Sequence, residues 1–160
     1  YGIGANALYG IDSRTGLATQ RVALVGDFTA LDAAPDGTLY ASAGNTLFRV
    51  DPSSGAVAPL ATYPAGLEAR GDLAAYGDLI VATARAVFNG PDTLVAFDVV
   101  AGTSREIGPI GFSCVYGLAA FGVTLYGLTC EGRVLRIDVG TGAGVQLASA
   151  SVHFYGATAR

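Results

Sequence analysis

A five-residue apolar unit that ends in aspartate occurs four times along the chain, and each copy reaches glycine four residues later. The copies are Leu8–Asp12, Leu47–Asp51, Leu94–Asp98 and Val134–Asp138, followed by Gly16, Gly55, Gly102 and Gly142. The steps between successive aspartates are 39, 47 and 40 residues. A period near 40 residues with strand-type content is typical of the blades of a β-propeller. We therefore predict an all-β repeat architecture.

A second repeated element precedes three of these units. It consists of a short strand of small residues, a glycine-containing turn and a β-rich strand, and its copies are Asp32–Tyr40, Leu73–Ile80 and Leu118–Tyr126. This pattern predicts a β-hairpin. With the aspartate-terminated strand and an outer strand such as 57–62 or 145–149, each unit has four strands. The aspartate, followed by Ser or Thr and by Gly, predicts a turn capped by its own side chain.

The two ends of the chain supply complementary parts of one blade. Phe154–Ala159 is similar to the inner strand 115–120, whereas Tyr1–Ile3 is similar to the second strand 126–128. We therefore expect a closed four-bladed propeller in which the C-terminal strand pairs beside the N-terminal one, because closure removes exposed sheet edges. Small inner-strand residues favour so few blades. The single domain 1–160 then divides into blade I (1–25 plus 153–160), blade II (28–62), blade III (72–108) and blade IV (114–149), with the extra residues of blade III at Arg85–Asp92.

The residue pattern of the repeats resembles that of bacterial extracellular propeller-repeat proteins of unknown function. Their repeats contain leucine-tyrosine, then aspartate, then threonine-glycine. The resemblance rests on residues spread over the whole chain: Leu8–Asp12 with Thr15-Gly16, Asp36–Tyr40, Asp51–Gly55, and Ile137-Asp138 with Thr141-Gly142. It implies the fold and a secreted setting, and it carries no catalytic residues. Blade III departs from it, with Ile80 and Val95 where the aromatic residue is expected.

Composition excludes several classes of partner. The 160 residues carry a net charge of −4, so there is no basic field for nucleic acid or anionic lipid. The uncharged run Ile107–Cys130 is long enough for a membrane helix. It contains Pro109 and several glycines, and part of it aligns with repeats that charges interrupt. We predict a soluble strand pair there, and neither a membrane nor a nucleic-acid partner.

Cys114 and Cys130 lie at equal distances from Gly122, the centre of the hairpin predicted in blade IV. Residues opposite one another on antiparallel strands are close enough for a disulfide with modest adjustment. We predict this disulfide, and with it an extracellular or periplasmic location. Two buried free thiols, or a metal pair without enough partners, are the alternatives.

One interpretation of the four repeated aspartates is that they bind calcium. Calcium needs several oxygen ligands around one point. One aspartate per blade, at the same strand end, is instead spread around the ring. We therefore interpret these residues as turn caps and expect no metal site.

Candidate ligand-binding residues come from the loops that share one face of a propeller. The connections from an outer strand to the next inner strand supply Asp27, Glu68, Arg70, Asp72, Phe112 and His153, and the turns between second and third strands add Asn6, Asn45, Asp92 and Glu131. A carboxylate pair with one Arg is suited to a polar ligand, and His153, the only histidine, adds acid–base capacity. The alternative is that these are solvated loop residues and that the asparagines merely suit tight turns.

The functional hypothesis is a non-catalytic, secreted and monomeric binding module that presents its loop face to a protein, a glycan or a small ligand. We expect no catalytic residue and no cofactor. One alternative is a small propeller enzyme of the lactonase, lyase or glycosidase kind, with Glu68, Asp72 and His153 at the axis. Another is a structural segment of a larger propeller.

Overall fold

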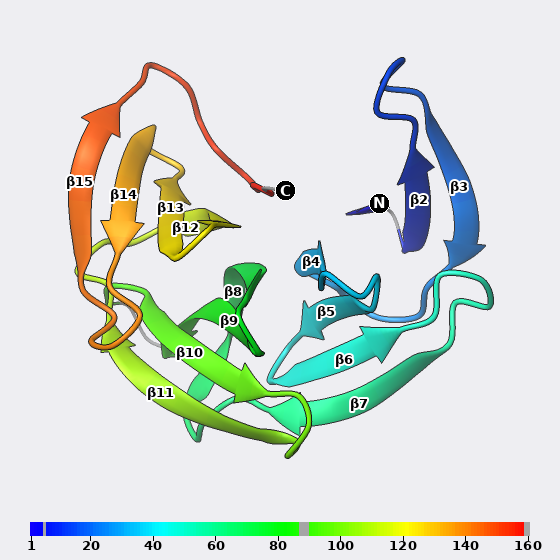
Figure 1. Ribbon diagram of the computed structural model, residues 1–160, viewed down its shortest axis with the longest axis horizontal. Helices are drawn as coiled ribbons and strands as arrows, with labels where there is room; N and C mark the ends of the chain where they lie inside the picture. Colours follow the sequence, from blue (N-terminus) through cyan, green and yellow to red (C-terminus); the bar gives the residue numbers. More distant parts are fainter. Residues whose placement is uncertain (5, 87–89, 159–160) are drawn as a thin grey trace.

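The computed structural model describes residues 1–4, 6–86 and 90–158 and places their strands in four antiparallel sheets around a common axis (Figure 1). Sheet I contains β1 (Gly2–Gly4), β2 (Ala7–Ile11) and β3 (Ala18–Ala23), and sheet II contains β4 (Ala30–Ala33), β5 (Leu39–Ala43), β6 (Thr46–Val50) and β7 (Val57–Thr62). Sheet III contains β8 (Leu67–Tyr76), β9 (Leu79–Ala86), β10 (Thr93–Asp98) and β11 (Thr103–Pro109). Sheet IV contains β12 (Val115–Phe121), β13 (Thr124–Thr129), β14 (Arg133–Ile137) and β15 (Gly144–Ser149). The prediction of an all-β fold is confirmed, and the uncharged run Ile107–Cys130 contains strands.

All four sheets share an irregularity at the same point of the ladder to the outermost strand. The register shifts directly after Leu8, Leu47, Leu94 and Val134. Each shift places one extra residue in the outer strand, which is a β-bulge, and a bulge increases the local twist of a sheet. The four sheets therefore share the position of this bulge.

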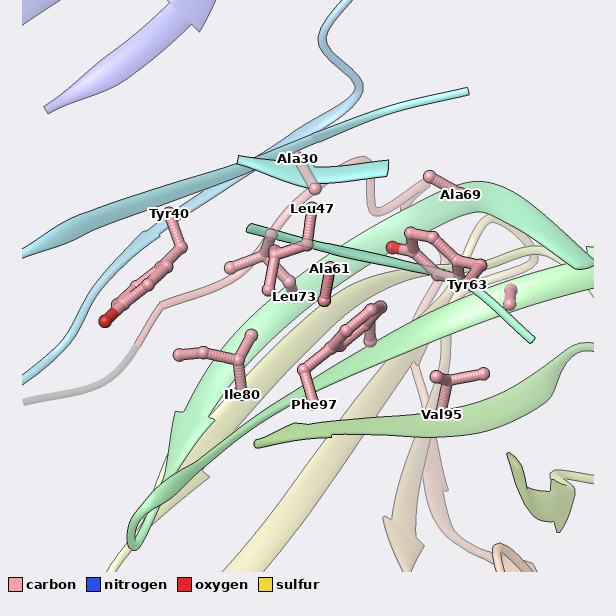
Figure 2. Packing of buried hydrophobic residues seen from close by; sticks show 12 residues of the cluster. Ala30, Tyr40, Leu47, Ala61, Tyr63, Ala69, Leu73, Ile80, Val95 and Phe97 are labelled. Carbon is pink, nitrogen blue, oxygen red and sulfur yellow. The ribbon is translucent and has the colours of Figure 1, made fainter. Parts of the chain in front are cut away.

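Apolar side chains fill the three spaces between successive sheets. Leu8 of sheet I and Leu24, which directly follows β3, pack with Leu39 and Val50 of sheet II. Figure 2 shows the next space, where Leu47 and Tyr63 meet side chains from sheet III such as Phe97. The third space joins sheets III and IV, with residues such as Leu94 and Leu135. Because sheets II and III are covered on both faces, strands such as β5, β9 and β10 are buried along most of their length.

Backbones approach one another closely near the axis, as the small residues of the inner strands predict. A Cβ atom added to Gly71 of β8 would lie 2.1 Å from the carbonyl oxygen of Val115. A Cβ added to Gly117 of β12 would lie 3.1 Å from the Cβ of Ala157. No side chain fits at Gly71 without a shift of the backbone, so the inner strands lie close together near the axis.

The expected closure of the ring is not seen. Sheet I has three strands, and residues 154–158, which we call the C-terminal segment, form no strand and do not pair with β1. The segment instead runs inward from sheet IV towards the axis, and a gap separates sheet I from sheet IV (Figure 1). The local repeat signal predicts each sheet, whereas closure depends on contacts between the two ends of the chain.

Strand pairing corrects one detail of the sequence alignment. Leu39 of sheet II pairs with Val50, and Leu125 of sheet IV pairs with Ile137. Val50 and Ile137 each directly precede the turn aspartate of their own sheet. In sheet III, Leu79 pairs with the turn aspartate itself, Asp98. Val81 therefore takes the place of Tyr40, and Ile80 does not. β8 begins at Leu67, ahead of the expected start of blade III at residue 72. The expected long loop Arg85–Asp92 includes residues 87–89, which lie outside the described residues.

Candidate functional site

The predicted disulfide between Cys114 and Cys130 is present, with a Cα–Cα distance of 5.5 Å. The backbone N–H of Cys130 also donates to the carbonyl oxygen of Cys114 at 2.8 Å. The symmetry argument succeeds for a reason that the sequence does not show. The hairpin pairs Phe121 with Thr124, so its centre lies beyond Gly122, and a register shift next to Val115 restores the opposition of the two cysteines.

The four repeated aspartates cap their turns, as predicted. In each turn the Oδ1 atom accepts the backbone N–H groups of the second and third residues that follow, and the glycine N–H donates to the carbonyl oxygen of the aspartate. These glycines have φ between 67° and 84°, a left-handed conformation that favours glycine. Backbone N–H donors hold the pKa of Asp12 and of Asp138 below its ordinary value, because they favour the charged form. These carboxylates stabilise turns, and within the described residues no group of three or more potential metal ligands occurs.

Asp72 is the buried member of the predicted ligand-binding set, with 7% of its surface exposed. It lies in β8, where the register with β9 shifts between Ala69 and Leu73. Its Oδ1 atom accepts the N–H of Leu73 at 3.0 Å. Its Oδ2 atom accepts the N–H groups of Leu118 at 3.1 Å and of Ala157 at 3.0 Å. The carboxylate therefore joins the inner strands of sheets III and IV to the C-terminal segment.

This arrangement follows from the edge position of the inner strands. The innermost strand of a sheet has N–H groups on its axial side without a ladder partner, and buried N–H groups need an acceptor. Asp32 of β4 acts in the same way, because its Oδ2 atom accepts the N–H of Ala75 at 3.0 Å and its Oδ1 atom accepts the Thr158 hydroxyl at 3.4 Å. Two carboxylates thus link β4, β8, β12 and the C-terminal segment around the axis.

Burial raises the pKa of Asp72 to about 6 from its ordinary value of 3.8. The N–H donors Leu118, Ala157 and Leu73 oppose this rise, and the nearby Asp32 adds to it. A carboxyl with such a pKa is a common feature of catalytic sites. Here its oxygens already accept three backbone hydrogen bonds, so it has a structural task.

The remaining predicted residues are dispersed. Glu68 is half-buried opposite Arg85 in the ladder, and Arg70 is exposed in the irregular part of β8. His153 is exposed, and its Nδ1 atom contacts the carbonyl oxygen of Cys130.

The guanidinium carbon of Arg133 lies 5.7 Å from the ring centroid of Phe112, a cation–π contact. In the described part of the chain, no hydrogen bond or ion pair joins any two of Asp27, Glu68, Arg70, Asp72, Phe112 and His153. The structure therefore does not assemble the six residues into one site.

Sequence reasoning missed a buried ion pair in sheet III. Arg85 Nη2 lies 2.8 Å from Asp92 Oδ1, and Asp92 is 1% exposed. Asp92 Oδ2 accepts the N–H of Val115 in the next sheet at 2.6 Å. The sequence predicts Asp92 only as a turn residue, because its partners come from a strand seven residues earlier and from another blade.

Asp27 and Asn6, both among the candidate residues, line a hollow. The hollow has a volume of about 200 Å³, lies between sheets I and II on the loop face, and is also lined by Ile3, Leu24, Phe28 and Thr29. Phe28 is fixed edge-on against Phe48, with ring centroids 5.6 Å apart. The hollow thus combines an exposed carboxylate with apolar walls, which suits a small group that is both polar and apolar.

No family model matches this chain, and no curated protein matches it. Solved structures share its fold at low identity. The computationally designed Ika4 protein is 14% identical with a TM-score of 0.51, over 82% of this chain and 79% of that one. A chain of the mitotic checkpoint complex is 16% identical with a TM-score of 0.57, over 81% and 41%. Puromycin hydrolase is 21% identical with a TM-score of 0.52, over 74% and 20%.

These likenesses concern the fold alone. The chain spans less than half the length of the checkpoint-complex chain and of puromycin hydrolase. Radial antiparallel sheets and a structural disulfide define the class as an all-β, propeller-like protein. The described part of the chain contains no helix that is long and apolar enough to cross a membrane.

Proposed function

We propose that this chain is a four-bladed propeller that works as a non-catalytic interaction module and presents its loop face to a partner in an oxidising, extracellular setting. The number of blades is supported by the axis. β4, β8, β12 and the C-terminal segment are linked there by Asp32 and Asp72. The setting is supported by the disulfide, since such bonds persist in oxidising compartments.

The main support for a non-catalytic role is that the buried carboxylates are already engaged in hydrogen bonds within the fold. An axial acid–base site needs a carboxylate that is free to meet a substrate. The oxygens of Asp72 accept three backbone N–H groups, and those of Asp92 contact Arg85 and the N–H of Val115. Both groups support the fold, which leaves recognition to the exposed loops.

The hollow around Asp27 is the contact point that we assign to the partner. Its carboxylate is exposed, and Phe28 and Thr29 stand beside it in the same connection. Binding sites on rigid scaffolds are commonly carried by such connections. A hollow of about 200 Å³ accommodates a side chain or one sugar-sized group of a larger partner.

Binding to a glycan array and to a peptide array tests the proposal. We expect saturable binding that weakens by about tenfold or more in Asp27→Ala, corresponding to loss of one charged contact. Asp78→Ala is the matched control, because Asp78 is an exposed aspartate in the β8–β9 hairpin at the other end of the sheets. Absence of saturable binding on both arrays, or equal weakening in the two variants, would contradict the loop-face hypothesis.

A panel of lactone and glycoside substrates tests the non-catalytic part. We expect no turnover above that of the buffer. Turnover that disappears in Asp72→Asn, with the fold retained by circular dichroism, would overturn this part and favour a propeller enzyme.

A further inference from the structure

Sheets II and III have one face towards the preceding sheet and one towards the following sheet. The bulge in the outermost strand of each sheet marks equivalent positions in the strand that pairs with it. Leu8, Leu47 and Leu94 precede this bulge, pack against the following sheet and are 0% exposed. Val134 holds the same position in sheet IV, where no sheet follows, and it is only half-buried. Sheet IV thus carries an apolar face that is built like the others and is not covered.

The opposite face of sheet I shows the same contrast. Val50, Phe97 and Ile137 directly precede the turn aspartates, pack against the preceding sheet and are 2%, 0% and 3% exposed. Ile11 takes this position in sheet I, where no sheet precedes, and it is 49% exposed. An aliphatic side chain gains free energy here only when a neighbouring sheet removes it from water.

The two uncovered faces correspond to the two sides of an interface that neighbouring sheets form elsewhere in the chain. In the space between sheets II and III, Tyr40 and Leu47 of one sheet meet Ile80 and Phe97 of the next. Tyr126 and Val134 of sheet IV match the first pair in strand register. Tyr126 is half-buried, whereas Tyr40 is 4% exposed. Ile11 of sheet I matches Phe97. We call the gap between these faces, which Figure 1 shows between β2 and β14, the seam.

The inner end of the seam is already bridged. The C-terminal segment packs against β12 through Ala157, which lies beside Gly117, and it reaches β4 through Thr158 and Asp32. It therefore occupies the fourth inner position, between the inner strands of sheets IV and II. Sheet I has no inner strand of its own, and the edge of β1 beside this position has no ladder partner among the described residues.

We infer that sheet I and sheet IV dock across the seam in solution and that the C-terminal segment then pairs with β1 as the fourth strand of sheet I. The inference rests on the four-bladed axis proposed above and deepens it, because it assigns the closing interface. Closure covers Ile11, Tyr126 and Val134 and supplies a partner for the free edge of β1. Both changes remove apolar surface or unpaired backbone groups from water.

The repeat also predicts the register of the new pair. In sheet IV, Gly117 pairs with Leu128 and Leu118 pairs with Gly127. The same register in sheet I pairs Gly156 with Ile3 and Ala157 with Gly2. The hydrogen bond from Ala157 N–H to Asp72 points to the axis, so it is compatible with a ladder on the other side of the segment.

The occupant of the seam is the chain's own other end and not a second copy. A second copy would have to bring its own inner strand to an axis where the fourth position is taken. The inner backbones already approach closely, since an added Cβ on Gly117 meets the Cβ of Ala157 at 3.1 Å. A head-to-tail contact between copies would also leave one uncovered face at each end of the assembly.

Cysteine cross-linking tests the inference in the full chain with its native disulfide intact. The pair Ile3→Cys with Gly156→Cys is in the predicted register, and nothing lies within 4 Å of a Cβ added to Gly156. The pair Ile3→Cys with Thr158→Cys is the control, displaced by two residues. Diagonal neighbours are about 7–8 Å apart, too far for a disulfide, so we expect the control to cross-link about tenfold more slowly or not at all.

Intact mass after alkylation and non-reducing electrophoresis give the outcome. We expect an intramolecular cross-link in the monomer. Covalent dimers, equal rates for both pairs, or no cross-link in either would overturn the inference.

Substitution in the seam gives a second readout. Ile11→Asp places a charge on the half-exposed face and is expected to slow the Ile3–Gly156 cross-link several-fold, because docking would bury that charge. Val100→Asp is the control, since Val100 is 95% exposed in the β10–β11 turn. Equal rates in the two variants would contradict docking. Array binding by the loop face does not require the cross-link, so failure of the proposed function and failure of closure are distinguishable.

Discussion

The Oδ2 atom of Asp72 accepts a hydrogen bond from the backbone N–H of Ala157 at 3.0 Å, although 85 residues separate the two in the chain. The same oxygen accepts the N–H of Leu118 from β12. One side chain therefore connects three segments that meet only at the axis. Substitution of Asp72 therefore measures how much these contacts contribute to the free energy of unfolding.

We expect Asp72→Ala to lower the free energy of unfolding by about 3 kcal/mol, because it leaves buried N–H groups without an acceptor. Urea unfolding followed by circular dichroism measures this change. Asp78→Ala, at an exposed turn, should stay within about 0.5 kcal/mol of the wild type. Equal effects in the two variants would show that Asp72 does not hold the axis together.

The pH dependence of stability should reveal the pKa of Asp72, which is about 6 in the folded chain and 3.8 ordinarily. Because the folded state binds the proton more tightly, this residue contributes stability that is fully present below about pH 4 and is lost as pH rises through about 6. Relative to Asp72→Asn, the wild type should therefore lose roughly 2 kcal/mol of stability between pH 4 and pH 7.

The turn carboxylates Asp12 and Asp138 act in the opposite direction. Their pKa values are lowered, so their contribution is present above about pH 4 and is lost at lower pH. The comparison of wild type with Asp72→Asn cancels these turns. A flat difference between the two proteins from pH 4 to pH 7 would refute the assignment to Asp72.

Removal of the disulfide should destabilise the chain measurably. Cys114 and Cys130 are 16 residues apart, and closing a loop of this size in the unfolded chain contributes about 3 kcal/mol in the chain-entropy treatment. The variant Cys114→Ala with Cys130→Ala should unfold at lower urea, and reductant should move the wild type to the same midpoint. Reductant should leave the variant itself unchanged, which serves as the control.

Gly71→Ala tests how closely the inner strands pack. The added Cβ would lie 2.1 Å from both the Val115 carbonyl oxygen and the Thr83 hydroxyl, so the backbone must move, at a cost of about 2–3 kcal/mol or more. Gly4→Ala is the matched control in β1, where nothing lies within 4 Å of the added atom. Thermal unfolding should separate the two variants by several degrees. Similar midpoints would indicate that the axis is looser than described.

Local patterns predict most of the strands but not their long-range arrangement. The turns at Asp12 and Asp51 are visible in the sequence because each aspartate caps N–H groups two and three residues away. The disulfide is predicted correctly, yet its register depends on a shift next to Val115 that no local pattern marks. Ring closure is not seen in this structure, and local patterns cannot establish it, since it requires contacts between residues more than 150 positions apart.

The candidate site shows the same limit. Asp72 stands out in the sequence as a carboxylate near the axis, and the structure places it there. Its carboxylate accepts N–H groups from Leu118 and Ala157, partners that only the folded chain brings near and that the sequence does not indicate. Asp92 escaped notice as a buried ion-pair partner because Arg85 and Val115 enclose it from two different sheets.

The bulge that recurs after Leu8, Leu47, Leu94 and Val134 has a consequence for solubility. The strands on the rim, β3, β7, β11 and β15, are outer edges that could otherwise serve as templates for other chains. An extra residue in each rim strand interrupts its regular row of hydrogen-bonding groups and bends it out of plane, which discourages edge-to-edge polymerisation. Deleting Leu60, the bulged residue of β7, should therefore flatten that rim and favour fibril growth at high protein concentration.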